Sequence, residues 1–341
     1  MLTGLIMAGI LLVLAALLLA GAKYRPNGEH FFNREDSGAM RGFWCLIVVL
    51  VHIPGAYQNR IQDMLGSFAY VGVTFFFLTS AYGLRLAAVK RPESLKAFWR
   101  NRLPKLLVPC LLTNAIGMAQ RALCGGGIVL RMLVWINGWV CWLLVCYFIF
   151  WACYRFLPAK RRDWAVCGLV SVFSLAVYWM KPETTTWCPE VLGFAWGILL
   201  SCRMDRFRGW LSRGWAAKSS AMCLLAACLG IAYLRWKEIP FFGDYVLKIA
   251  LGMAILGFLL ALNTTISIGN PISRTLGAIS FEVYLLHGGV FFALESAFPE
   301  LNSGVFILAS LLLTILLSLA ARKLSERILN PFDKKQQMLQ R

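Results

Sequence analysis

An arginine and a histidine separated by ten residues form the first pair whose types and spacing could support catalysis. Arg41 and His52 flank the apolar run GFWCLIVVLV. Eleven steps of about 100° make roughly three helical turns, so both side chains project from one helix face, about 16 Å apart. Imidazole can take a proton from a hydroxyl near neutral pH, and an arginine can bind an anion at the pocket entrance. The spacing alone leaves open a histidine bonded within a helix bundle and an arginine that only flanks a membrane.

Two further ionisable side chains lie well inside an apolar run. Glu282 and His287 share one segment, and His287 is about 15 Å from its predicted inner end. Charged groups in hydrocarbon are costly, which makes such residues candidates for function. We predict that His287 orients an acceptor or His52; the alternative is a hydrogen-bonded core histidine. Glu282 is expected to pair with a cation such as Arg85.

The composition identifies the elements that must position these residues. Of 341 residues, 59% are hydrophobic and 15% are charged, and the net charge is +18. Such a chain cannot hide its apolar runs in a water-soluble domain, and it is too hydrophobic for a disordered one. The cations lie in short gaps between apolar runs rather than on one domain, so no nucleic-acid partner is expected. The fold class predicted is an all-α, polytopic membrane bundle surrounded by membrane lipid.

The apolar runs and the charges between them predict a topology. We expect eleven spans, near 2–22, 42–58, 67–84, 106–120, 137–154, 164–180, 189–202, 216–234, 246–262, 276–295 and 304–321. Alternate loops hold 27 of the 34 Lys and Arg, which predicts a cytoplasmic C-terminus and an outside N-terminus. The 263–275 loop is the weakest member of the inner set, because it has a single arginine. The first run is expected to be a retained helix rather than a signal peptide.

The Arg41/His52 segment is followed in order by four motifs, FFFLTSAYGL (75–84), FWRNRLPKLLVP (98–109), ISFEVYLLH (279–287) and SERILNPF (325–332), and together they resemble the integral-membrane acyltransferase 3 family. The Arg41/His52 segment resembles the opening helix of that family. FFFLTSAYGL (75–84) resembles its FFxxSGY helix, with Ser80 on the serine and Ala81 in place of the glycine. FWRNRLPKLLVP (98–109) resembles its basic segment, with Arg102 and with Lys105 where a second arginine is usual.

The closing motifs complete the resemblance. ISFEVYLLH (279–287) resembles the family's ISYxxYLxH helix and supplies Ser280, Tyr284 and His287, while SERILNPF (325–332) loosely matches its final segment, with Glu326 on the glutamate. The resemblance implies a ten-helix core. We therefore divide the chain into an extra N-terminal helix and loop at 1–35, a membrane acyltransferase domain at 36–332 and a cytoplasmic tail at 333–341.

The resemblance implies transfer of an acyl group, in most members acetyl, from cytoplasmic acyl-CoA to a hydroxyl of a cell-surface or exported carbohydrate. His52 would then be the base and His287 its partner, with Arg41 beside them. Acetyl-CoA or another acyl-CoA would be the donor, and no metal is expected. Arg41, Arg102 and Lys105 would bind the CoA phosphates; the alternative is that these cations only set the topology.

Other features are expected to be secondary to the reaction. Ser80, Tyr82 and Tyr284 are expected to line the substrate pocket, or to make hydrogen bonds between helices. Trp135, Trp139 and Trp142 are interpreted as membrane-interface anchors, with a weaker hypothesis of sugar stacking. Cys124 and Cys188 fall in predicted outside loops and could form a disulfide.

The acceptor and the cellular setting are left open by these patterns. The acceptor could be a surface polysaccharide or a lipid-linked sugar, in a bacterial-type inner membrane beside other cell-envelope synthesis enzymes. A transporter or flippase using the same bundle without chemistry is the main alternative, and the lack of a recognisable inverted repeat counts against it. An intact Arg41/His52 pair counts against a membrane sensor with a dead site.

Overall fold

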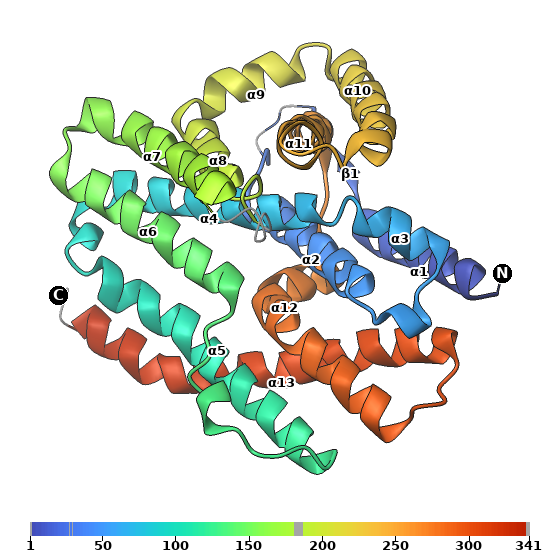
Figure 1. The fold of residues 1–341 in the computed structure, drawn as a ribbon. Coiled ribbons are helices and arrows are strands. Elements are labelled where there is room, and N and C mark those ends of the chain that lie inside the picture. The colour runs from blue at the N-terminus through green and yellow to red at the C-terminus, as the bar shows by residue number, and fades with distance from the viewer. Residues whose placement is uncertain (1, 27, 29, 181–186, 339–341) are drawn as a thin grey trace.

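The computed structural model describes residues 2–26, 28, 30–180 and 187–338, and over this part of the chain the protein is almost entirely helical (Figure 1). The N-terminal elements are α1 (Leu2–Leu19), β1 (Lys23–Tyr24), α2 (Arg34–Val51), η1 (Gly55–Tyr57), α3 (Arg60–Gly66), α4 (Tyr70–Lys90), η2 (Pro92–Leu95) and α5 (Phe98–Leu123). The middle contains η3 (Leu130–Met132), α6 (Gly138–Phe156), α7 (Ala159–Met180), α8 (Leu192–Cys202), α9 (Met204–Ser212) and α10 (Trp215–Trp236). The last elements are η5 (Phe242–Leu247), α11 (Lys248–Asn263), β2 (Ile266–Ser267), α12 (Pro271–Ala297) and α13 (Ser303–Met338).

The helices bear out the prediction of an all-α membrane protein. Among the described residues, eight helices are long and apolar enough to cross a membrane, and two shorter apolar helices, Gly4–Leu19 and Leu192–Cys202, accompany them. The remaining predicted span is α2, whose first turns carry the charged residues Arg34, Glu35, Asp36 and Arg41. Each predicted apolar run therefore has a helix. The structure adds α3 and α9, which are too short to cross a bilayer core of about 30 Å.

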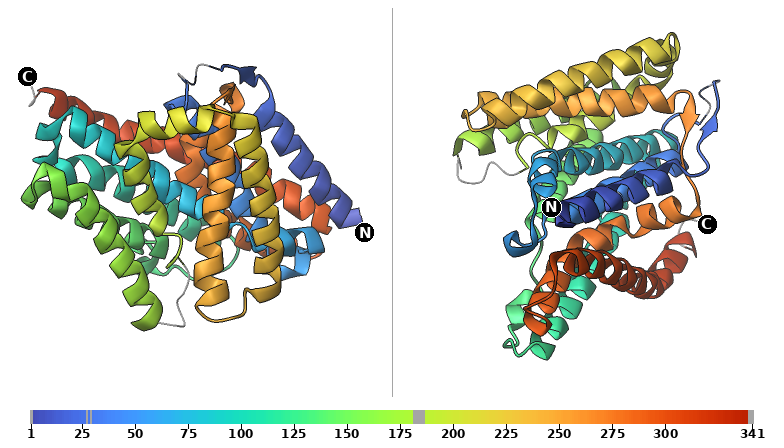
Figure 2. Two further views of the ribbon diagram at one scale, coloured as in Figure 1. Left: turned by 90° about the horizontal axis from the view of Figure 1, so that it is seen from above. Right: turned by 90° about the vertical axis from the view of Figure 1, so that its right-hand side faces the viewer.

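A short antiparallel pairing places two loops at the same end of the bundle. In it, Lys23 of β1 lies opposite Ser267 of β2, and Tyr24 lies opposite Ile266. This brings the 263–275 loop, with its single arginine, beside the basic 23–41 loop, as the charge alternation predicts. Figure 2 shows this pair and the C-terminal part of α13 at one end, and the turn between α10 and η5 at the other.

Two ion pairs connect loops that share an end of the bundle. Arg85 binds Asp163 at 3.1 Å, and Arg85 Nη1 also donates to the Ser201 carbonyl oxygen, which joins the ends of α4, α7 and α8. At the opposite end, Lys248 binds the buried Glu190 at 2.7 Å. The pairing expected between Glu282 and Arg85 is wrong: Glu282 lies nearest to Arg322, at 3.5 Å, because α12 packs against α13.

Glycines bring two pairs of helices into unusually close contact. A side chain on Gly193 or Gly197 of α8 would overlap the backbone of α4. A side chain on Gly277 of α12 would overlap the carbonyl oxygen of Gly38 in α2, and one on Gly42 would lie 2.7 Å from the Gly277 nitrogen. Small residues four apart allow such backbone approach inside membranes. The close contact between α2 and α12 therefore constrains the relative positions of the two histidines that these helices carry.

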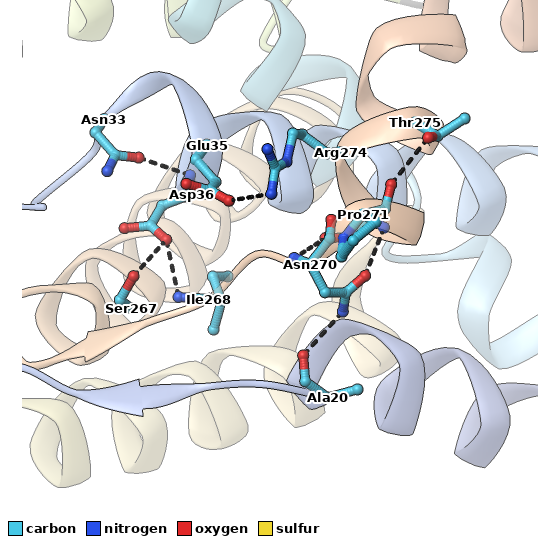
Figure 3. A network of polar contacts seen from close by, with 11 residues as sticks. Ala20, Asn33, Glu35, Asp36, Ser267, Ile268, Asn270, Pro271, Arg274 and Thr275 are labelled. Atoms are coloured by element: carbon cyan, nitrogen blue, oxygen red, sulfur yellow. Dashed lines mark hydrogen bonds and ion pairs between the residues drawn. The ribbon is translucent and has the colours of Figure 1, made fainter.

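A polar network at the β1–β2 end ties α1, α2 and α12 together (Figure 3). The Asn270 amide donates to the carbonyl oxygens of Leu17 in α1 and of Ala20 just after it, and its oxygen accepts from the Ser273 nitrogen at the start of α12. Asp36 of α2, which is fully buried, accepts from the Ile268 nitrogen at 2.8 Å. The extra N-terminal helix is thus anchored directly to the helix that carries His287.

We predict that Asn270→Ala lowers stability because it removes the cap of α12 and both bonds to α1. The lost cap alone costs about 1 kcal/mol. The thermal midpoint in detergent should fall by several degrees. Thr275→Ala is the matched control, since it removes one exposed hydrogen bond to the Pro271 carbonyl oxygen within the same helix. Equal midpoints for the two variants would show that the anchor has no such role.

Candidate active site

Two histidine rings from different helices face each other inside the bundle. The ring centroids of His52 and His287 are 5.2 Å apart, with their planes inclined at 60°. The helices carrying them, α2 and α12, run in the same direction, so that Cys45 meets Ser280 and His52 meets His287. The structure therefore brings together the two histidines singled out in the sequence, although they are more than 200 residues apart.

The prediction that His52 lies in the middle of a continuous span is wrong. The helix ends at Val51, and His52 is its C-cap, with a backbone N–H that bonds the Val49 carbonyl oxygen. The chain then turns through η1 instead of continuing to residue 58. Because α12 extends about ten residues beyond His287, roughly 15 Å, the helix end lies within the depth of the bundle. His52 is exposed there rather than packed in a helix interface.

One hydrogen bond determines which nitrogen of His52 can act as a base. Its Nδ1 lies 2.7 Å from the Val48 carbonyl oxygen. A carbonyl oxygen only accepts, so Nδ1 carries the proton in this bond, and in the neutral ring Nε2 then has the lone pair. A fixed tautomer with a free Nε2 is the arrangement that general-base catalysis requires.

Aromatic side chains surround the second histidine. His287 is half-buried, with its ring centroid 5.9 Å from that of Tyr284 and 5.5 Å from that of Phe291. The ring centroid of Tyr284 in turn lies 5.3 Å from that of Trp139. Trp139 is buried at 6% exposure, so its interpretation as an interface anchor is wrong. It packs inside the bundle because α6 presents it to α4 and α12.

Arg41 lies in α2 and binds the neighbouring helix α12. Its Nε and Nη2 atoms donate to the Gly277 carbonyl oxygen at 3.2 and 2.7 Å. This oxygen belongs to the glycine at the closest approach of α2 and α12. Arg41 therefore helps to hold the helix crossing that sets the distance between the histidines.

A buried tyrosine that the sequence did not single out connects several predicted residues. Tyr147 of α6 is buried near Ser80 and lies within electrostatic reach of both Arg102 and Arg41. No motif marks Tyr147, which sits in an apolar run like any core residue. Only the packing of α6 against α4 and α5 reveals it.

The other predicted pocket residues are distributed differently. Tyr82 packs edge-on against Phe32, with centroids 4.9 Å apart, and so does not share the surroundings of Tyr284. Lys105 is exposed on α5, in a helix that contains Pro104 and Pro109. No disulfide joins Cys124 to Cys188: the Cys124 thiol points towards the Ala293 carbonyl oxygen, and Cys188 is buried beside Tyr178 and Tyr245.

A cavity of about 850 Å³ is lined in part by α12, the helix that carries His287, although neither His52 nor His287 is among its lining residues. It is formed by α5, α12 and the connection that contains η3. Its lining residues are Thr113, Asn114, Gly117, Gln120, Arg121, Arg131, Met132, Val134, Trp135, Ile136, Leu285, Leu286, Gly288, Gly289 and Phe292. Leu286 and Gly288 directly flank His287 in the sequence, so one turn of α12 carries both the histidine and part of the cavity wall.

A protein-family model described as an acyltransferase domain matches residues 35–323. Because this match covers most of the chain, the protein belongs to this family, the acyltransferase 3 family, and is an acyltransferase. The matched region begins at the start of α2 and includes both histidines. No curated protein and no solved structure matches the chain.

Proposed function

We propose that this protein is a membrane-embedded O-acyltransferase that moves an acyl group, acetyl in the simplest case, from cytoplasmic acyl-CoA to a hydroxyl of a cell-surface or exported carbohydrate. The observation that carries the proposal is the exposed His52 ring, whose Nδ1 is bonded to Val48 and whose Nε2 is therefore available as a base.

The proposed chemistry is direct transfer with His52 as general base. Bound acyl-CoA would supply an activated thioester carbonyl. His52 Nε2 takes the proton of the acceptor hydroxyl as that oxygen attacks the carbonyl carbon, and it returns the proton to the departing thiolate. His287 holds its ring against His52 and so limits the orientations the base can adopt. Holding the His52 imidazole and the acceptor hydroxyl together in the site supplies much of the remaining rate enhancement.

The donor would be held at the basic end of the bundle. Arg102 is half-buried, and both Arg102 and Arg41 lie within electrostatic reach of Tyr147. Guanidinium groups bind phosphate oxygens bidentately, which suits the phosphates of CoA. Lys105 on the same helix would add a point charge. This assignment places the β1–β2 end, with most of the cations, in the cytoplasm, and the N-terminus outside, in a bacterial-type inner membrane.

A transporter or flippase would use the same bundle without breaking a bond. Membership of an acyltransferase family favours chemistry over transport. The experiment that tests the proposal supplies acyl-CoA labelled on its acyl group to purified protein in detergent with a mixture of saccharides. We expect label to appear in ester linkage, which mild alkali releases. Uptake of saccharide into vesicles without any labelled ester would support transport instead.

We predict that Arg102→Gln raises the KM for acyl-CoA about tenfold, because a charge-assisted hydrogen bond to phosphate is lost. The kcat should change little, since the residue does not contact the reacting atoms. Initial rates over a range of acyl-CoA concentrations measure both constants. Arg91→Gln is the control, as it removes one exposed arginine from the same region. A fall in kcat at unchanged KM would contradict a donor-binding role.

A further inference from the structure

The cavity beside α12 has an unusual balance of charge. Its lining includes Arg121 and Arg131 but neither aspartate nor glutamate. Over the part of the chain that the structure describes, neither arginine forms an ion pair with a carboxylate. Both lie at the end opposite the β1–β2 pair, in the loop region predicted to be outside. The cavity therefore carries positive charge that the protein itself leaves uncompensated.

Arg121, the more buried of the two arginines, has a buried side-chain nitrogen without a hydrogen-bond partner. Arg121 Nε is buried without a hydrogen bond, and the guanidinium lies over the Phe292 ring at 5.7 Å. The neighbouring Gln120 Oε1 is also buried without a partner. Buried polar groups without partners are costly, so a site that retains them is suited to a ligand that supplies an acceptor for Arg121 Nε and a hydroxyl donor for Gln120 Oε1.

Two glycines enlarge the cavity at positions where packing against a neighbouring side chain or helix does not require a glycine. A side chain at Gly117 or Gly288 would meet no atom within 4 Å, unlike one at Gly289, which would crowd Gln120. Glycine in a helix is less stable than alanine, and here close helix contact does not explain it. Their effect is to leave open space on the walls of α5 and α12, and Gly288 directly follows His287 in the sequence.

An aromatic side chain completes the cavity wall and is held in place. The Asn114 amide donates to the Leu133 and Trp135 carbonyl oxygens at 3.0 and 2.6 Å, which pins the connection containing η3 onto α5. Trp135 itself is 66% exposed. An exposed indole face beside cationic groups can cover the apolar face of a sugar ring while the cations bind its charged substituent.

From these features we propose that the cavity binds the acceptor, and that the acceptor is an anionic saccharide bearing a carboxylate or phosphate group. The inference rests on the proposed acyltransferase function and names its acceptor class. Arg121 and Arg131 bind the anionic group, and Trp135 packs against a sugar ring. The cavity volume is within the range of small-molecule sites and leaves space for more than one ring.

Binding measured without turnover tests the inference. Purified protein in detergent is titrated calorimetrically with a galacturonic-acid tetramer, with glucose 6-phosphate, and with the neutral tetramer maltotetraose. We expect one or both anionic probes to bind about tenfold or more tightly than the neutral one, since each guanidinium contributes a charge-assisted hydrogen bond. The relative affinities for the first two probes then distinguish a carboxylate from a phosphate.

Three variants locate the binding. Arg121→Gln with Arg131→Gln should abolish the preference for the anionic probes, while Arg131→Gln alone, at an exposed position, should reduce it. Gly288→Leu should weaken binding of every probe, because its side chain enters open space in the cavity without a clash. Arg235→Gln, an exposed arginine of α10 outside the cavity, should leave the affinities unchanged.

The outcomes separate this inference from the function on which it rests. Equal affinity for anionic and neutral probes, or a preference that survives in the double variant, overturns the inference. If the protein still transfers acyl groups to neutral sugars, the proposed function stands without it. Arginine-dependent binding with no transfer to any saccharide would instead overturn the proposed function.

Discussion

Replacing His52 with alanine should reduce the rate of acyl transfer by about 10²–10⁴-fold, the usual contribution of a general base. No other imidazole occupies its position, because His287 approaches it from a separate helix at 5.2 Å and Nε2 of His52 is the nitrogen left free by the Val48 bond. Transfer of labelled acyl groups by purified variants, at saturating donor, measures the loss. The KM for acyl-CoA should change little, because the donor phosphates are assigned to the basic end of the bundle.

The protein should still fold when His52 is removed. The residue is exposed, and its side chain contributes a single hydrogen bond to backbone at the end of α2. Gln58→Ala is a close control, since it also removes an exposed side chain that donates one hydrogen bond to backbone, at the Ile53 carbonyl oxygen. Full activity in Gln58→Ala and loss in His52→Ala would assign the effect to the imidazole. Comparable rates in the two variants would exclude His52 as the base.

Gly277→Val is expected to cause the largest loss of folded protein. A side chain there overlaps the Gly38 carbonyl oxygen, and its first carbon would lie 2.7 Å from the Gly38 carbonyl carbon. Neither atom is at the end of a flexible side chain, so α2 and α12 must separate. Overpacking costs about 1–3 kcal/mol where side chains can adjust, and a clash between backbones should cost at least the upper value.

The same substitution should also remove activity from any protein that survives. Separating α2 from α12 breaks both Arg41 bonds to Gly277 and moves His52 away from His287. The measurements are the yield of monodisperse protein in detergent and the transfer rate per folded molecule. Gly168→Val in α7 is the matched control, because it lies in a helix interior at an exposed position where an added carbon meets nothing within 4 Å. Equal yields for both valine variants would refute the constraint placed on the crossing.

The periodicity and charge of the chain were sufficient for the fold class. Apolar runs long enough to cross a bilayer can only form helices in lipid, where each backbone group must bond within its own segment. The basic loops alternate because cations are retained on one side of the membrane. For this reason even the 263–275 loop, with little charge of its own, was assigned to the end where β2 pairs with β1. The boundaries were less predictable, as α2 shows by ending at Val51 and not near residue 58.

The residues of the candidate site were likewise predictable from the sequence only in part. Arg41, His52 and His287 stand out from the sequence because ionisable groups are rare in apolar runs, and short motifs carried the family resemblance. Tyr147 does not stand out, since a tyrosine among apolar residues has no distinguishing pattern and becomes relevant only through its neighbours Ser80 and Arg102. The partner of Glu282 was misassigned for the same reason: charge alone cannot tell Arg85 from Arg322.

Local patterns therefore determined which segments are helices, which loops share an end, and which residue types could perform the chemistry. Tertiary structure decided what those residues face. The 5.2 Å approach of the two histidines depends on glycines of α2 and α12 that allow backbone contact, and the cationic cavity depends on α5, α12 and a loop meeting at one place. Such contacts join residues far apart in the chain, and their free energy comes from packing shape, which no single segment encodes.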